Sequence, residues 1–268
     1  MKHLFKKWAN FAADRRAASH LLLLADYDGT LTPIVGKPAD AVLSSSVKDK
    51  LQTLAARSDV SLGVISGREL AEIASLVGIK GIYYAGNHGL EMEGPGLEYT
   101  GPAKSIFIGV AMAEMAAKIA AALADVPGII IQDKGLSLSV HYRLAPESEE
   151  ARIAGVVRQV AEGWVKSRKI QIFGMKKVWE IRPLLDWDKG KAVQSIQSEI
   201  IRKLKPDRLL TVFLGDDTTD EDAFKVLRRP SGWSVFVGEG DKTSAAAYYL
   251  VSPAEVEEFL SRLIEMKL

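Results

Sequence analysis

Six short apolar runs, each ending in a polar or glycine-rich turn, restrict the fold more than any other feature of the sequence. They cover residues 21–30, 60–68, 82–89, 209–220, 233–240 and 247–253. Helical patterns separate most of them, at residues 46–57, 69–77, 189–204, 219–228 and 254–266. Continuous apolar runs suit strands that are buried on both faces, as in a parallel sheet. Their alternation with helices predicts an α/β layered domain built on a parallel sheet.

The stretch from residue 102 to 184 has a different pattern. Helices are expected at about 104–125 and 147–168, and each precedes two short strand-like runs. Residues 136–142 alternate strictly between apolar and polar side chains, which predicts a half-exposed antiparallel strand. We therefore expect a separate α+β domain at 102–184, inserted into a core made of residues 1–101 and 185–268.

Composition excludes several functional classes. The net charge of +1 gives no support to a nucleic-acid binder. The absence of cysteine excludes disulfides and thiolate metal sites, and it fits a reducing, cytoplasmic compartment. We expect neither a bilayer-spanning segment nor a secretory signal. Apolar residues 4, 5, 8 and 11 fall at helical spacing, which fits a helix packed on the body or one that meets a membrane surface or a partner.

Acidic residues follow the first apolar run directly. Asp26 and Asp28 lie in the string Asp-Tyr-Asp-Gly-Thr after four leucines and an alanine. Ligands of an open parallel sheet bind beyond the carboxyl ends of its strands. Two carboxylates at such an end repel each other unless a cation neutralises them. Asp28-Gly29 by itself would also suit an ordinary turn.

A second acidic cluster follows the run that begins at residue 209. Asp216, Asp217 and Asp220 lie in it, with two further acids before residue 223. Thr218 and Glu221 match a capping box, but capping does not need five acids in seven residues. Two acidic strand ends facing one crevice would form an oxygen-only site, which suits Mg²⁺.

Two further residues, both between the two acidic strings in the sequence, suit phosphate binding. Ser66 ends the second run and, with Glu69, matches a capping box; a hydroxyl at a helix N-terminus also suits a phosphate. Lys189 begins a helix, where a cation is unfavourable by roughly a few tenths of a kcal/mol unless an anion faces it. A solvated surface lysine remains the alternative for Lys189, and Lys191 is the competing choice.

In this order, the Asp-x-Asp-Gly-Thr-Leu string, the strand-end serine, the lysine and the Gly-Asp-Asp string resemble the haloacid dehalogenase (HAD) superfamily of aspartate-dependent phosphatases. Longer strings resemble the trehalose-6-phosphate phosphatases, over about residues 20–260; they are residues 26–34, 65–68, 86–91, 141–143, 179–183 and 215–222. The resemblance implies a Rossmann-like core with an inserted α+β cap of the C2 type.

The resemblance also implies catalytic roles. Asp26 would be the nucleophile that forms an aspartyl-phosphate, and Asp28 the acid and then the base. Ser66 and Lys189 would hold phosphate oxygens. The cofactor would be Mg²⁺, bound by Asp26, Asp216 and the carbonyl of Asp28, with Asp217 and Asp220 supporting it directly or through water.

Substrate contacts are expected from seven residues: Arg68, Asn87 and His88 in the core, and Lys134, His141, Arg143 and Glu180 in the cap. Each cap residue also has a structural interpretation, as a turn lysine, a solvated strand face or a structural glutamate. His88 could serve only the backbone of its turn. The family often has glutamate where this chain has Gln132, which removes a charge-assisted acceptor.

The resulting hypothesis is a monomeric phosphatase of trehalose 6-phosphate, linked functionally to a trehalose-6-phosphate synthase. Two alternatives remain. The substrate could be another glycosyl phosphate, such as sucrose 6-phosphate or a mannosyl-phosphoglycerate. The chain could also be a non-catalytic sugar-phosphate sensor or a partner domain of a synthase.

Overall fold

The computed structural model describes residues 1–100 and 106–266 of the chain. It contains two compact units, one made of Met1–Tyr99 with Trp187–Leu268 and the other of Thr100–Asp186. The sequence-based boundaries were 102 and 184. The boundary at 102, and the expected helix start at 104, lie outside the described residues.

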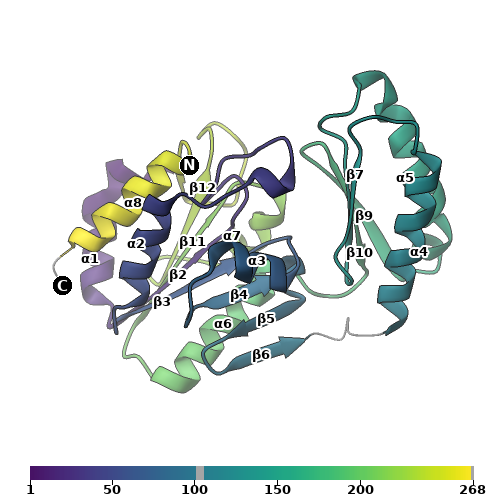
Figure 1. The fold of residues 1–268 in the computed structure, drawn as a ribbon. Helices are drawn as coiled ribbons and strands as arrows, with labels where there is room; N and C mark the ends of the chain where they lie inside the picture. The colour runs from purple at the N-terminus through teal and green to yellow at the C-terminus, as the bar shows by residue number, and fades with distance from the viewer. Residues whose placement is uncertain (101–105, 267–268) are drawn as a thin grey trace. The chain divides into compact units, whose positions relative to one another are not determined.

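The first unit is built on one large sheet (Figure 1). In the described part of the chain it has nine strands in the order β1-β13-β12-β11-β2-β3-β4-β5-β6. Their bounds are Lys2–His3 (β1), His20–Ala25 (β2), Val60–Ile65 (β3), Tyr83–Gly86 (β4), Glu91–Gly94 (β5), Leu97–Thr100 (β6), Leu209–Gly215 (β11), Gly232–Val237 (β12) and Tyr248–Leu250 (β13). From β1 to β4 every neighbouring pair is parallel, and β5 joins β4 antiparallel. The parallel α/β core is therefore confirmed.

Helices cover both faces of this sheet (Figure 1). On one face pack α1 (Trp8–Ala17), α2 (Ser45–Ala55), α3 (Leu70–Val77) and α8 (Pro253–Glu265); on the other pack α6 (Lys189–Leu204) and α7 (Glu221–Val226). Successive leucines of β2 alternate between the two layers: Leu21 and Leu23 join the first, Leu22 and Leu24 the second. Burial on both faces explains why this strand has no polar residue facing solvent.

The N-terminal segment packs on the body of the first unit. Leu4 and Phe11 are fully buried, and the rings of Trp8 and Phe11 make edge contacts with Phe259 of α8. Of the two interpretations of its aromatic spacing, the packed helix is confirmed. No helix in the described ranges has both the length and the apolar character that crossing a membrane requires.

The second unit is an α+β layer of its own. Helices α4 (Ile106–Ala122) and α5 (Glu150–Lys166) pack on an antiparallel sheet, which the described residues order as β7-β8-β10-β9. The strands are Ile130–Asp133 (β7), Leu138–His141 (β8), Ile170–Met175 (β9) and Val178–Pro183 (β10). Each helix precedes two strands, as the pattern predicted.

One expectation for this sheet is wrong. Two residues of the expected polar face, Ser137 before β8 and Ser139 within it, are 0% and 1% exposed; only His141, at the end of the strand, is half-buried. Ser139 lies between Gln132 and Glu180 in the sheet register. Alternation identified the antiparallel strand, but the side chains of neighbouring strands decide how much water reaches a face.

The chain leaves the first unit once and returns to it once, and an aromatic pair connects the residues at these two points. Tyr99 ends its segment of the first unit and Trp187 begins the next. Their rings stack with centroids 4.8 Å apart and an interplanar angle of 18°.

Candidate active site

The site of the first unit lies where the strand order reverses. The chain proceeds from β2 to β3 and β4 on one side, while β11, paired directly with β2, leads to β12 and β13 on the other. Asp26 follows the last residue of β2, and Asp216 follows the last residue of β11. Because both strands run in the same direction, these two acids meet at one end of the sheet. Such a reversal is where open α/β sheets bind ligands.

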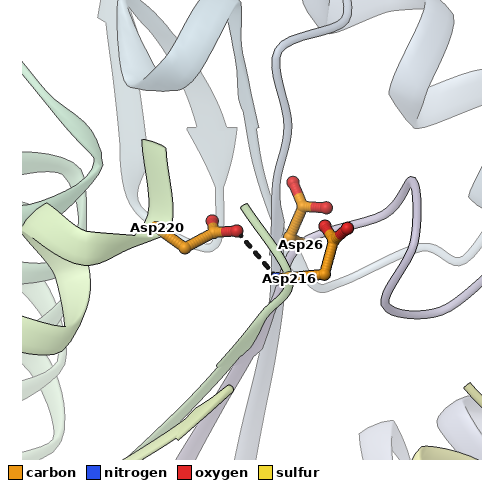
Figure 2. Close-up of side chains that lie close together, drawn as sticks. All are labelled: Asp26, Asp216 and Asp220. Atoms are coloured by element: carbon orange, nitrogen blue, oxygen red, sulfur yellow. Dashed lines mark hydrogen bonds between the residues drawn. The ribbon is translucent and has the colours of Figure 1, made fainter. Parts of the chain in front are cut away.

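Asp26, Asp216 and Asp220 form a buried carboxylate cluster (Figure 2). Each offers an oxygen within 4.8 Å of the others, and their exposed fractions are 6%, 5% and 0%. In Figure 2 the carboxylates of Asp26 and Asp216 point the same way, and Asp220 approaches from the start of α7. The predicted meeting of the two acidic strand ends is what the structure shows.

The ammonium of Lys189 lies among these carboxylates. Its Nζ is 2.6 Å from Asp26 Oδ1 and 2.7 Å from Asp220 Oδ1, and the residue is 2% exposed. Lys189 is the first residue of α6, whose N-cap is Asp188; the Asp188 side chain accepts from Lys191 N at 2.9 Å. The lysine is thus a buried partner of the acids and not a solvated surface residue.

Burial and charge set the protonation of this cluster. Loss of solvation raises the pKa of the Asp26 carboxyl well above its ordinary value; Lys189 opposes this, while Asp220 and Asp216 add to it. Burial alone would lower the pKa of Lys189, but the charges of Asp220 and Asp26 outweigh burial and raise it. The lysine therefore stays charged, and the acids compete for protons or cations.

The cluster fits a hard divalent cation. With all three carboxylates ionised, the cluster and the ammonium of Lys189 carry a buried net charge of −2, and all the possible metal ligands are oxygens. The turn after Asp28 packs tightly on the same acids: a Cβ at Gly29, whose φ is +91°, would stand 2.3 Å from Asp216 Oδ2. A larger residue at Gly29 would displace that carboxylate.

Asp217 and Asp220 have different structural roles within the second acidic string. Asp220 Oδ2 accepts hydrogen bonds from the backbone N–H groups of Asp216 and Asp217, at 3.0 and 2.9 Å. Asp217 caps the short turn of 3₁₀ helix at Thr218–Asp220, and its carboxylate is not part of the buried cluster. The expected Thr218–Glu221 capping box is wrong: the box is Asp217–Asp220, because Asp220 reaches back to the strand end.

The turn after β3 places Ser66 at 1% exposure. Its backbone N–H bonds Ala85 O at 2.9 Å, and its Oγ accepts from Arg68 N at 3.2 Å. The expected capping box with Glu69 is wrong, because Glu69 is itself the N-cap of α3 and Ser66 belongs to the strand end. The hydroxyl proton of Ser66 can still be donated to a ligand.

Arg68 and Asp28 form a two-pronged ion pair. The Nε and Nη2 atoms of Arg68 each lie 2.8 Å from a different oxygen of Asp28. Arg68 also donates to Pro38 O at 2.8 Å and contacts Glu72 through Nη1. Sequence reasoning missed Glu72, which lies four residues after Arg68; Arg68 itself precedes the N-cap of α3.

Asn87 and His88 occupy the turn after β4, with φ values of +49° and +58°. Both are buried, and Asn87 Nδ2 donates to Glu91 Oε2 at 3.1 Å. His88 faces the Ser66 turn: a Cβ at Gly67 would stand 2.6 Å from His88 Nε2. The turn thus lies beside the β3 end, where a role in the backbone and a role toward substrate are both compatible with the geometry.

The four remaining predicted residues belong to the second unit. Lys134 Nζ is 3.6 Å from Glu180 Oε1, and His141 Nε2 is 2.8 Å from Gln132 Oε1. Arg182, which was not singled out, also contacts Glu180 at 3.0 Å. Arg143 is exposed and donates to Lys176 O at 2.7 Å, at the β9–β10 turn. The structure thus joins Lys134 with Glu180, and His141 with the divergent Gln132.

The chain matches the trehalose-phosphatase family over residues 24–254. It is 33% identical to probable trehalose-phosphate phosphatase 3 of Oryza sativa in an alignment of 277 residues, gaps included, that covers 97% of this chain and 74% of that protein. It is 36% identical to trehalose-phosphate phosphatase of Mycobacterium tuberculosis over 255 residues, covering 94% of this chain but only 63% of that longer protein.

A solved structure agrees with the sequence comparisons. The C-terminal domain of the Candida albicans trehalose-6-phosphate phosphatase superposes with a TM-score of 0.78, at 26% identity and with 96% of both chains covered. That domain and this chain share the HAD-like core and cap architecture. With the aspartate cluster at the strand reversal and this match over most of its length, the chain belongs to the trehalose-phosphatase family, a group of phosphoric monoester hydrolases.

Proposed function

We propose that the chain hydrolyses trehalose 6-phosphate to trehalose and phosphate, with Mg²⁺, through an aspartyl-phosphate on Asp26. The observation that carries the proposal is the buried cluster of Asp26, Asp216, Asp220 and Lys189 at the strand reversal. Relatives named as trehalose-phosphate phosphatases support the choice of substrate.

The first half of the reaction transfers the phosphoryl group to the protein. A carboxylate oxygen of Asp26 attacks phosphorus while the bond from phosphorus to the sugar oxygen breaks. The departing oxygen takes its proton from Asp28. Bound Mg²⁺, held by Asp26, Asp216 and the Asp28 carbonyl, would supply positive charge that lets two anions approach each other.

The second half regenerates the carboxylate. Asp28, now a base, removes a proton from a water molecule whose oxygen attacks phosphorus, and the bond between phosphorus and Asp26 breaks. Ser66 and Lys189 stabilise the phosphoryl oxygens throughout. Lys189 suits this role because two carboxylates hold its ammonium beside Asp26.

We assign recognition of the sugar to polar side chains of the second unit, with Asn87 and His88 assisting. Lys134 and Glu180 offer a donor and an acceptor on one sheet face, as dense hydrogen bonding to a polyol requires. Gln132 bonds His141, so an amide takes the place that glutamate often has in the family.

Phosphate release from a sugar-phosphate panel tests the proposal. The panel holds trehalose 6-phosphate, sucrose 6-phosphate, glucose 6-phosphate and a mannosyl-phosphoglycerate, each measured with Mg²⁺ and with EDTA. Mg²⁺-dependent release that strongly favours trehalose 6-phosphate is the expected result. A clear preference for another member would keep the chemistry and reassign the substrate.

Asp26→Asn tests the nucleophile directly. The amide lacks the anionic oxygen, so steady-state turnover should vanish while the fold persists. A ³²P-labelled substrate should label wild-type protein in an acid quench but not this variant. Normal turnover in Asp26→Asn would remove the mechanism. Tight sugar-phosphate binding without turnover in the Mg²⁺-loaded wild type would favour the sensor alternative.

A further inference from the structure

We propose that Arg68 is a positioning residue that holds the Asp28 carboxylate in place for proton transfer, and not a ligand of the substrate. The inference rests on the proposed function, because it assigns a partner to the acid of that mechanism. It departs from the sequence-based expectation, which placed Arg68 among the substrate-binding residues.

The side chain of Arg68 has its three nitrogens bonded within the protein. Nε and Nη2 hold the two oxygens of Asp28 at 2.8 Å each, Nη2 also donates to Pro38 O, and Nη1 contacts Glu72. The ring of Tyr27 lies under the guanidinium, 5.5 Å from its carbon. These bonds use four of the five N–H groups of the guanidinium, which leaves one N–H of Nη1 for an incoming phosphate or sugar.

The exposure of the pair is unequal. The Arg68 side chain is 7% exposed, whereas the Asp28 side chain is 41% exposed. Main-chain bonds fix the arginine further: its N–H donates to Ser66 Oγ, and its carbonyl accepts from Asn87 N at 2.7 Å. A buried, fixed fork therefore grips a carboxylate that faces solvent, and a planar two-pronged pair sets the orientation of that carboxylate.

Within the part of the chain that the structure describes, Arg68 is the only side chain that bonds or pairs with the Asp28 carboxylate. Asp28 lies two residues after Asp26, in the turn that follows β2. Without Arg68, rotation about the side-chain bonds would spread the carboxylate over several orientations. Before Asp28 delivers a proton to the leaving oxygen, one of its oxygens must take up that proton, which breaks one of the two bonds to Arg68. The other bond then keeps the acid in one orientation, as proton transfer at hydrogen-bond distance requires.

The dependence of rate on the leaving group separates positioning from substrate binding. kcat/KM should be measured for nitrophenyl phosphate, phenyl phosphate, an alkyl phosphate and trehalose 6-phosphate. A nitrophenolate leaves without a proton, whereas a sugar or alkyl oxygen needs one. kcat/KM reports formation of the aspartyl-phosphate alone, so the later base step of Asp28 does not contribute.

Arg68→Lys keeps the charge and loses the fork, and it is the primary variant. We expect kcat/KM to fall by roughly tenfold or more with the alkyl and sugar esters, within the range that general acids contribute. The loss should shrink steadily as the leaving group improves and be smallest with nitrophenyl phosphate. Glu72→Gln, which loosens the far side of Arg68, should shift the series in the same direction but less.

The matched control is Arg202→Lys. Arg202 also binds a carboxylate with two nitrogens: its Nε and Nη2 donate to the two oxygens of Glu199, at 2.9 and 2.7 Å. It lies 13 residues after Lys189 along α6, about 20 Å away at the usual rise of a helix. This variant should leave the whole series unchanged. Melting temperatures of all variants establish that each remains folded.

Several outcomes would overturn the inference. An equal loss with every ester would make Arg68 a phosphate ligand or a purely structural residue. A higher KM for trehalose 6-phosphate alone, with the alkyl ester unaffected, would restore the substrate-ligand role. If the wild type cleaves aryl and alkyl phosphates but not trehalose 6-phosphate, the proposed substrate fails while the ester series still tests Arg68.

Discussion

Replacing the buried ammonium of Lys189 by the neutral, similarly long side chain of methionine tests how the acid cluster is held together. In Lys189→Met the cluster loses two contacts, of 2.6 Å to Asp26 and 2.7 Å to Asp220. With an effective dielectric constant of about 20, each attraction amounts to about 6 kcal/mol before desolvation is subtracted. Desolvation of the ammonium cancels much of this, and breaking one side of a buried pair costs about 3–5 kcal/mol in practice.

We therefore expect the free energy of unfolding of Lys189→Met to fall by about 3–5 kcal/mol at pH 8 in EDTA. The loss should shrink at pH 5, because Asp26, whose pKa is already raised by burial, takes up a proton in place of its lost partner. Mg²⁺ should restore part of the loss, since a cation replaces the missing positive charge. Urea unfolding followed by tryptophan fluorescence measures all three effects.

Lys191→Met is the control, because Lys191 lies two residues further along the same helix and was the competing candidate. Its expected cost is under about 1 kcal/mol, as for a partly exposed lysine. An unfolding free energy of Lys189→Met within about 1 kcal/mol of wild type in EDTA would refute the reasoning. Equal losses in the two variants would refute it as well.

Three further predictions concern the same cluster. Gly29→Ala should impair activity and Mg²⁺ binding by isothermal titration, because its Cβ would stand 2.3 Å from Asp216 Oδ2 at a φ of +91°; wild-type affinity would contradict this. Asp220→Asn should cost about 1–3 kcal/mol in urea unfolding, since an amide NH₂ would face donors from Lys189 or the Asp216 backbone; an unchanged midpoint would contradict the assigned bonds. The raised pKa of Asp26 means that the folded protein binds more protons than the unfolded chain. Relative to Asp26→Asn, wild-type stability in EDTA should therefore be greatest below about pH 4 and decline as pH rises through that pKa; a rise over that range would contradict the shift.

The layout of the core could be predicted because its physical causes are local. Strands buried on both faces leave continuous apolar runs, and parallel neighbours bring their carboxyl ends together. The sequence alone could therefore predict that Asp26 and Asp216 lie side by side. The edge strand β1 could not be predicted from the sequence. It has only two residues, and it pairs with β13, near the other end of the chain.

Caps and ion pairs were predicted less well, because they depend on exact positions and on packing. Both expected capping boxes were wrong. Ser66 belongs to a strand end, and α3 has no side-chain cap. Asp220 bonds the backbone of Asp216 and Asp217 and so forms the box with Asp217. Arg68 was expected to contact the substrate. Its burial and its pairing with Asp28, 40 residues away, follow only from the folded chain.

The stacked rings of Tyr99 and Trp187 have a consequence for how such a chain can vary. The chain leaves the first unit after Tyr99 and returns to it at Trp187, and the two rings are in contact. The 87 residues between them therefore begin and end at neighbouring points, as the residues of a short loop do. The entropy cost of closing a loop rises only slowly with its length, by about 0.6 kcal/mol for each doubling. The stack therefore holds the two ends of the first unit together independently of the residues between them, so an exchange of the whole intervening unit need not alter the strand order of the host sheet.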